Sequence, residues 1–139
     1  MKIPARLANE YCQACGLWKL CKSPRIEGEG SQHPTWLFVG EAPGATEDEK
    51  GIPFIGDAGY LLRQIVEESG IDLEKCRFTN AVKCRPPDNN LKKFPKATEY
   101  CRAHILREIR SANPKVVVLV GGVAISSILH RTGVLKLNG

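Results

Sequence analysis

The residues whose spacing most clearly indicates chemistry are four of the six cysteines. Cys12 and Cys15 form a C-x2-C pair, while Cys84 and Cys101 form a second, wider pair. Four thiolates brought together by a fold suit either structural zinc or an iron–sulfur cluster, and spacing alone does not separate the two. The alternative is that Cys84 and Cys101 are ordinary buried thiols. We expect a metal centre that ties the amino-terminal arm to the core.

A second chemical feature is the stretch Gly40–Gly59, GEAPGATEDEKGIPFIGDAG, which is rich in glycine, proline and carboxylates. It follows the apolar run Thr35–Val39, which has the pattern of a buried strand. A long irregular segment in a compact domain is usually functional. Ligands of open α/β sheets bind at the carboxyl ends of the strands, so this stretch is predicted to be an active-site loop.

The elements that must position these residues alternate along the chain. Strand and helix patterns follow one another, which predicts an α/β fold with three layers, α/β/α, around a central parallel sheet. We expect a single domain over residues 1–139, with a Cys-rich arm over residues 1–34. The predicted elements are a strand at Thr35–Val39, a helix from Asp57 to Gly70, a strand at Cys76–Lys83, a helix at Pro95–Ala112, a fully buried strand at Lys115–Val120 and a helix at Val123–His130.

The composition limits the class of protein. The formal net charge is +5, and the basic excess is concentrated in Lys19–Arg25 and Lys83–Arg102. This favours a polyanionic partner such as nucleic acid, although surplus surface lysines alone would give the same balance. The longest apolar run, Val116–Val120, is far too short to span a membrane, and Met1–Leu7 lacks the apolar core of a signal peptide. We expect no membrane association and a cytoplasmic location.

The motifs together resemble one known family. They are Gly40-Glu-Ala-Pro-Gly44, Glu47-Asp48, Gly51-Ile-Pro-Phe-Ile-Gly56, Ala58-Gly59, Thr79-Asn80-Ala-Val-Lys-Cys-Arg-Pro-Pro87 and the two cysteine pairs. This joint pattern, which covers nearly the whole chain, resembles the family 4 uracil-DNA glycosylases, the iron–sulfur members of the uracil-DNA glycosylase superfamily. The resemblance implies excision of uracil from DNA. It also implies a [4Fe-4S] cluster on Cys12, Cys15, Cys84 and Cys101, with zinc as the alternative.

The resemblance also implies roles for single residues. An enzyme that acts on a base in DNA must extrude the base, stack on its face and read its edge. Phe54 is the candidate for stacking, and Asn80 for reading the edge, since an amide donates to uracil O4 and accepts from N3–H. The corresponding alternatives are a core aromatic and a turn residue at the end of a strand.

Cleavage develops positive charge on the sugar and negative charge on the departing base, so a carboxylate near the sugar would help. Glu41 is our first candidate and Glu47 the second, whereas Asp48 and Glu49 are expected to be solvated or to cap the loop. The best-known branch of the superfamily has a water-activating aspartate at the position of Ala42, which argues against a strict general-base mechanism. The remaining candidates are Ala42, Pro43 and Gly44 for substrate, and Lys83, Arg85, Lys92 and Lys93 for DNA phosphates.

One departure from the family concerns the end of the sequence. In this family a fourth strand and a histidine motif that faces uracil O2 follow the position of Gly139. We therefore expect a shortened domain that lacks the last strand and has an open sheet edge, through which it could associate. His33, His104 and His130 do not match that histidine, and we expect His104 and His130 on the surface.

This departure keeps a second function open: a non-catalytic iron–sulfur DNA-binding or assembly module derived from the same family. An unrelated nucleotide-binding α/β protein is a third possibility. It would need a glycine-rich phosphate loop, and GEAPG does not have that spacing.

Overall fold

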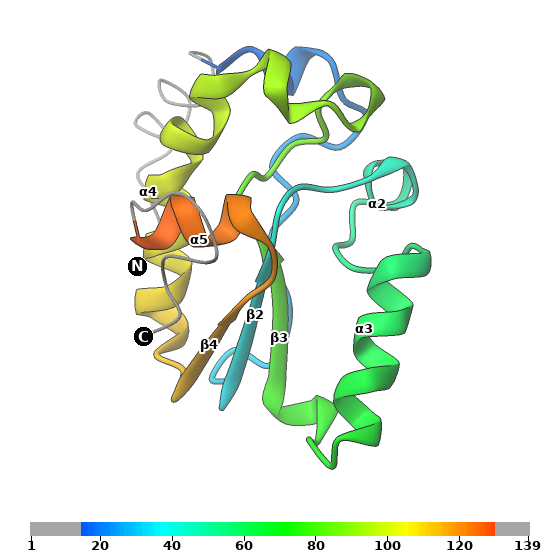
Figure 1. Ribbon diagram of the computed structural model, residues 1–139, viewed down its shortest axis with the longest axis vertical. Helices are drawn as coiled ribbons and strands as arrows, with labels where there is room; N and C mark the ends of the chain where they lie inside the picture. The colour runs from blue at the N-terminus through cyan, green and yellow to red at the C-terminus, as the bar shows by residue number, and fades with distance from the viewer. Residues whose placement is uncertain (1–14, 130–139) are drawn as a thin grey trace.

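The computed structural model describes residues 15–129, which form a four-stranded sheet in the order β1-β3-β2-β4. Strands β2, β3 and β4 are parallel, and the two-residue strand β1 pairs antiparallel with β3. Helix α3 covers one face of the sheet, while α4 and α5 lie on the other (Figure 1). The predicted three-layer fold is therefore confirmed, with β1 as an addition that the sequence pattern did not indicate. The strands are β1 (Glu29–Gly30), β2 (Trp36–Gly40), β3 (Cys76–Asn80) and β4 (Val116–Leu119), and the helices are α2 (Ala45–Lys50), α3 (Asp57–Glu68), α4 (Pro95–Ala112) and α5 (Gly122–Leu129).

The core consists of apolar clusters on the two faces of the sheet. Leu37 and Val39 of β2 point towards α4 and α5, where they pack in one cluster with Ile105. Phe38 and Phe78 point to the opposite face and pack with residues of α3. This alternation follows from the two-residue period of a strand. Each of these side chains contributes about 1.5–3 kcal/mol by leaving water.

Helix α4 begins and ends where the sequence pattern predicts. Pro95 occupies its first turn, where the missing N–H costs no hydrogen bond. Asn113 follows its last residue in the left-handed conformation and donates its N–H to the carbonyl of Ile109 at 2.9 Å. Ala97, Cys101 and Ile105 lie along its buried face, as predicted.

Strand β4 is less buried than predicted. The run of β-branched residues indicates a strand covered on both faces, but Val116 is 38% exposed and the next three residues are only half-buried. The physical reason is its position, because within residues 15–129 β4 pairs only with β2 and forms an edge of the sheet.

The segment between β2 and α3 also differs from the prediction, because it contains the short helix α2. This helix has no apolar stripe, and it is stabilised by the side chain of Glu47, which accepts the N–H of Gly44 at 2.9 Å.

None of the helices within residues 15–129 is long and apolar enough to cross a membrane. Short 3-10 turns complete the structure at Leu17–Lys19, Leu73–Lys75, Pro87–Asn89 and Leu91–Lys93.

Candidate active site and cysteine pocket

The candidate active site lies at the carboxyl ends of β2 and β3. Gly40, the last residue of β2, is the register partner of Asn80, the last residue of β3. The pairing continues beyond the strands, since the N–H groups of Ala81 and Val82 donate to the carbonyls of Gly40 and Glu41 at 2.9 Å each. The start of the predicted loop and the predicted edge reader are therefore held side by side.

Phe54 returns to the same point from the far side of the loop. A Cβ atom at Gly40 would lie 2.6 Å from Cζ of Phe54 and 2.7 Å from Oδ1 of Asn80. Both distances are far shorter than a van der Waals contact, so any side chain at this position would displace the ring or the amide. Asn80 is 5% exposed, and the Phe54 ring also packs against Phe78, with the ring centroids 5.6 Å apart. The structure thus brings the two predicted base-recognition residues together.

The first residues of the loop present one carboxylate to solvent. Glu41 is exposed, whereas Pro43 is buried and Ala42 and Gly44 are half-buried. Ala42 packs against the cluster that contains Cys84 and Cys101. Of the two carboxylates predicted for catalysis, Glu41 is therefore the one that faces solvent beside the Gly40–Asn80 pair.

Glu47 is buried and binds the backbone of its own loop. Its carboxylate accepts the N–H groups of Gly44 at 2.9 Å, Ile55 at 3.0 Å and Gly56 at 2.5 Å. These bonds join the start of α2 to the segment that carries Phe54. This geometry makes Glu47 a residue that shapes the loop.

The neighbouring carboxylate of Asp48 points to a different part of the chain. It is 4% exposed and accepts the N–H groups of Lys22 at 3.0 Å and Ser23 at 2.9 Å. Asp48 is therefore neither solvated nor a cap of its own loop, because it binds a segment 25 residues away. Glu49 is exposed and 3.5 Å from the ammonium of Lys22, as expected for a surface carboxylate.

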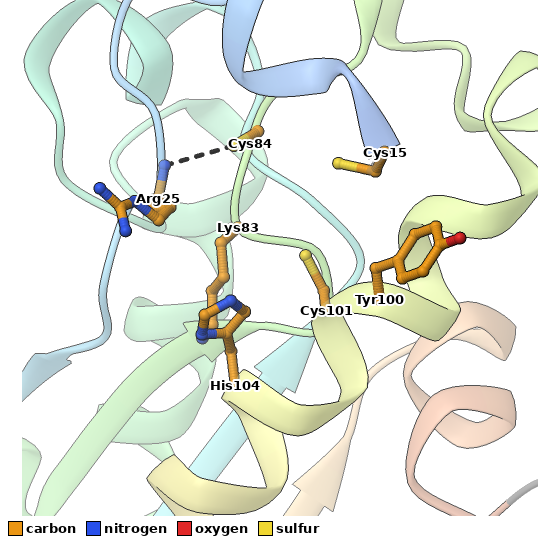
Figure 2. Close-up of a pocket in the computed structure, with 7 residues that line it drawn as sticks. All are labelled: Cys15, Arg25, Lys83, Cys84, Tyr100, Cys101 and His104. Atoms are coloured by element: carbon orange, nitrogen blue, oxygen red, sulfur yellow. Dashed lines mark hydrogen bonds between the residues drawn. The ribbon is translucent and has the colours of Figure 1, made fainter. Parts of the chain in front are cut away.

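Three of the predicted metal ligands line one pocket. Cys15, Cys84 and Cys101 surround it together with Arg25, Lys83, Tyr100 and His104 (Figure 2). The thiols of Cys15 and Cys101 point into the space between the amino-terminal arm and α4. The fourth predicted ligand, Cys12, lies outside the described residues. Within residues 15–129 no group of three or more His, Cys, Asp or Glu side chains is placed so that it could hold a metal ion, and these three cysteines are no exception.

The surroundings of the cysteines affect their protonation. Burial raises the pKa of the Cys84 thiol to about 12, although the N–H of Arg25 donates to its sulfur at 3.3 Å. The chemistry of the pocket still fits a soft metal, because it brings together sulfur donors, and binding would release the thiol protons. Cys21 packs against the apolar residues around Cys84 and Cys101, and burial raises the pKa of its thiol.

His104 is half-buried and lines the cysteine pocket. This corrects the expectation that it lies on the surface. Burial lowers its pKa, and the nearby charges of Lys83 and Arg25 lower it further. His130 lies outside the described residues.

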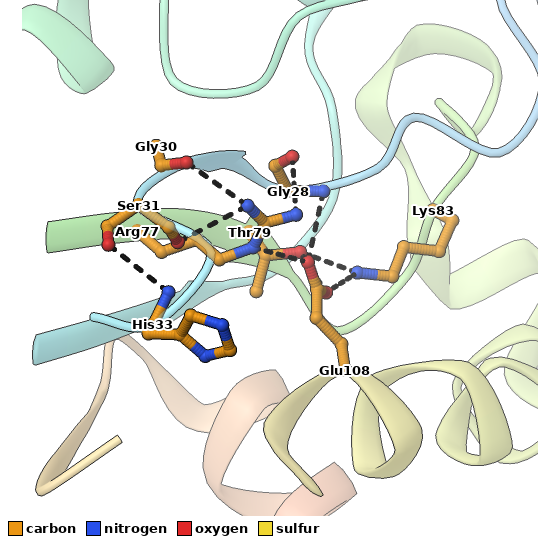
Figure 3. Close-up of polar contacts among 8 residues, drawn as sticks. All are labelled: Gly28, Gly30, Ser31, His33, Arg77, Thr79, Lys83 and Glu108. Carbon is orange, nitrogen blue, oxygen red and sulfur yellow. Dashed lines mark hydrogen bonds and ion pairs between the residues drawn. The ribbon is translucent and has the colours of Figure 1, made fainter. Parts of the chain in front are cut away.

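Lys83 is not available to DNA, which corrects its assignment as a phosphate contact. The residue is 6% exposed, and its ammonium lies 2.6 Å from the carboxylate of Glu108 and 2.5 Å from the hydroxyl of Thr79 (Figure 3). Glu108 also binds Arg77 at 3.2 Å and accepts the N–H of Gly28 at 3.1 Å. A buried ion pair therefore joins α4 to β3 and to the segment before β1.

Glu108 is the residue that the sequence analysis missed. Burial by itself would raise the pKa of its carboxyl group, but the Lys83 ammonium, hydrogen bonds from Lys83 and Thr79, and Arg77 outweigh it and hold the pKa below its ordinary value. A signal was present, because Glu108 lies three residues after Ile105, on the buried side of α4. A carboxylate at that position indicates a buried partner.

The other basic candidates are accessible. Lys92 and Lys93 are exposed in the turn Leu91–Lys93. Arg85 is half-buried, and its Nε donates to Oδ1 of Asn89 at 2.9 Å. These three residues lie on the connection between β3 and α4, which leaves the sheet at the end where Asn80 lies.

The sequence matches known proteins over most of its length. Residues 27–138 match the model of the uracil DNA glycosylase superfamily. The type-4 uracil-DNA glycosylase of Thermotoga maritima is 39% identical over 130 residues, which cover 92% of this chain and 67% of that protein. The type-4 enzyme of Saccharolobus solfataricus is 41% identical over 79% of this chain and 50% of its own length. That of Archaeoglobus fulgidus is 39% identical over 86% and 59%, respectively.

The chain therefore belongs to the uracil DNA glycosylase superfamily. Within that superfamily it is similar to the type-4 enzymes. It spans between half and about two thirds of the length of the curated relatives described above.

Proposed function

We propose that this chain is a uracil-DNA glycosylase that hydrolyses the N-glycosidic bond of a uracil flipped out of DNA. The observation that carries this proposal is the fit of Gly40 between Phe54 and Asn80, with 2.6 and 2.7 Å to a hypothetical Cβ. An aromatic ring and an amide meet there at the carboxyl ends of parallel strands, where ligands of such sheets bind. The similarity to type-4 uracil-DNA glycosylases supports the same activity.

Recognition of uracil rests on hydrogen bonding at one edge and stacking on one face. The Asn80 amide would donate to uracil O4 and accept from N3–H, whereas cytosine offers a donor and an acceptor in the reverse places. Because Asn80 is buried, a mismatched base would leave polar groups unpaired at about 1–3 kcal/mol each. The Phe54 ring would stack on the base, and stacking of this kind tolerates any base. Selectivity for uracil over cytosine is therefore assigned to Asn80.

Cleavage requires stabilisation of the positive charge that develops on the deoxyribose. Glu41 is the residue we assign to this role, because its carboxylate is exposed one residue beyond Gly40. Glu47 keeps the loop in shape through its bonds to Gly44, Ile55 and Gly56. The N–H of Gly44 is already bound to Glu47. We therefore assign the segment Ala42–Gly44 to the wall of the substrate site and assign no hydrogen bond to the N–H of Gly44. Lys92, Lys93 and Arg85 are the proposed contacts to DNA phosphates.

The cysteine pocket is proposed to hold a [4Fe-4S] cluster, with Cys12 as the fourth ligand beside Cys15, Cys84 and Cys101. The support is the convergence of the three described cysteines from separate parts of the chain: the arm, the connection that follows β3, and α4. A bound cluster would supply a covalent cross-link between these elements. The cysteine residues thereby fix the arm onto the core.

An excision assay tests the proposed activity. Purified protein is incubated with an oligonucleotide that contains one uracil, and abasic sites are detected by alkaline strand cleavage. An otherwise identical oligonucleotide with cytosine in place of uracil is the control. We expect cleavage at uracil only, reduced at least about tenfold in Asn80→Ala because buried polar groups lose their partner. Absence of abasic sites at a large enzyme excess would refute the proposal.

The metal centre is tested by metal analysis of protein purified without oxygen. We expect iron and acid-labile sulfide in the wild type and their loss in Cys101→Ser. Cys76→Ser is the matched control, since Cys76 is fully buried but lies in the cluster of Phe38 and Phe78. Zinc without iron in the wild type would exclude the iron–sulfur cluster.

A further inference from the structure

Phe54 has an unusual backbone conformation for a residue that must present an aromatic ring. Its φ angle is 58°, in the left-handed region that side chains with a Cβ rarely adopt. Such a conformation persists only where the surroundings determine it. The question is therefore which contacts hold Phe54 in this conformation.

One of these contacts is a side chain of α3. Nε of Arg63 donates to the carbonyl of Phe54 at 2.9 Å, and its Nη2 donates to the carbonyl of Pro53 at 3.3 Å. Two successive carbonyls of the loop therefore bind one guanidinium, whose planar fork suits such an arrangement. Both peptide units next to Phe54 are oriented by Arg63.

The guanidinium itself is held from two other directions. Its carbon atom lies 4.3 Å from the ring centroid of Phe78, which is a cation–π contact. Nη2 also pairs with the carboxylate of Glu29 in β1 at 2.9 Å. Arg63 is only 21% exposed, whereas Glu29 is 49% exposed, so packing against Phe78 and the two carbonyl bonds hold the guanidinium and the ion pair adds little.

The loop also approaches α3 closely at Gly59. A Cβ atom at that position would collide with the backbone of Phe54. The absence of a side chain at Gly59 thus lets Phe54 lie against the first turn of α3. On its other side, the N–H of Ile55 is bound to Glu47 at 3.0 Å.

We propose that Arg63 is a positioning residue for uracil recognition, which holds Phe54 in the conformation that presents its ring beside Asn80. This inference rests on the proposed function and extends it to a residue that would not touch the base. Since stacking is made both before and during bond cleavage, loss of the positioning weakens binding of the base more than it slows the chemical step.

The kinetic test uses Arg63→Gln on a uracil-containing single-stranded oligonucleotide. We expect KM to rise about tenfold, which lies within the range by which loss of base stacking weakens affinity. We expect kcat to change less than about threefold. Glu29→Gln is the matched control, because it removes the ion pair of Arg63 and leaves both carbonyl bonds. Its KM is expected to stay within about twofold of the wild type, as for an exposed pair.

A double-mutant cycle separates positioning from general stability. In a Phe54→Ala background, Arg63→Gln is expected to change KM by less than about twofold, since the residue it positions is gone. An undiminished tenfold rise in that background would overturn the proposal. If Arg63→Gln does not fold, Arg63→Lys serves instead. It keeps the charge but binds only one carbonyl, so we expect an intermediate KM.

A conformational readout keeps this inference independent of activity. The three-bond coupling between the amide and α protons of Phe54 reports its φ angle in solution. We expect this coupling to change in Arg63→Gln and to stay the same in Glu29→Gln. If the wild type cleaves no DNA, the proposed function fails, and this coupling still decides whether Arg63 positions Phe54; an unchanged coupling would refute the positioning role.

Discussion

The two faces of strand β3 have opposite characters. Arg77 and Thr79 point towards α4, where they join the buried carboxylate of Glu108. Phe78 and Asn80, which alternate with them, lie on the face of Phe54 and the active-site loop. One face thus carries charges that are matched within the protein, and the other carries an aromatic ring and a neutral amide. The comparison shows that five residues both anchor the sheet and form the proposed recognition site.

The difference has a physical basis. A buried charge is tolerated only when it is paired, so the Glu108 face is expected to affect stability strongly. A neutral amide can be buried without a charged partner, so the Asn80 face is expected to affect the reaction more than the stability. Mutations on the two faces should therefore separate stability from activity.

The largest effect is expected on the charged face. Glu108→Ala leaves Lys83 buried without its partner, and we expect a loss of about 3–5 kcal/mol in the free energy of unfolding. Urea denaturation followed by circular dichroism measures this loss. Glu49→Ala is the control, because the ion pair of Glu49 with Lys22 is exposed and should contribute little. A loss of less than about 1 kcal/mol for Glu108→Ala would show that the network is not a buried pair of this kind.

The next effect is expected on the recognition face. In Gly40→Ala, the new methyl group would displace Phe54 or Asn80, and we expect kcat/KM for uracil excision to fall about 100-fold, as for a misplaced active-site group. Gly122→Ala is matched to it, because a Cβ at Gly122 meets no atom within 4 Å. That variant should retain full activity. Equal activity of the two variants would exclude a tight gap at Gly40.

A smaller effect on the charged face is expected from pH. The pKa of Glu108 is held below its ordinary value, so its contribution to stability is present above the ordinary carboxyl pKa of about 4.3 and is lost as the pH falls through the folded-state pKa. The stability difference between the wild type and Glu108→Gln should therefore shrink on acidification. Denaturation curves between neutral and acidic pH check this, and a constant difference would contradict it.

The smallest effect is expected from the surface lysines on the connection between β3 and α4, at the end of the sheet where Asn80 lies. Lys92→Ala and Lys93→Ala should each weaken binding to any DNA sequence and reduce the slope of log K against log salt by about 1. Fluorescence anisotropy at several salt concentrations measures this slope. Lys75→Ala is the control, because Lys75 is exposed and directly precedes β3, at the end of the strand opposite Asn80. An identical slope in all three variants would remove Lys92 and Lys93 from the DNA interface.

Features that depend on local pattern could be predicted from the sequence. The apolar run before Gly40 marks β2, and Pro95 marks the first turn of α4. These predictions of strand and helix succeeded because near neighbours in the chain determine them. Phe54 and Asn80 came from motifs of the family resemblance, and the structure places both next to Gly40; their roles in recognising a base stay predictions.

Features that depend on distant partners could not be predicted in the same way. Lys83 looks like a surface residue until Glu108, 25 residues further along the chain, is placed beside it. Helix α2 has six residues and no apolar stripe, and its carboxylates bind backbone groups outside the helix. The exposure of β4 follows from its position at the edge of the described sheet. In each case the packing of the whole domain decides the outcome.

Helix α2 has a consequence for the opening motions of the protein. Its adjacent carboxylates bind opposite partners, Glu47 the amides of Ile55 and Gly56, and Asp48 the amides of Lys22 and Ser23. Unfolding of this one short helix would release all four amides at once. The amides of Lys22, Ser23, Ile55 and Gly56 should therefore exchange their hydrogens through one cooperative opening, with a common free energy of opening.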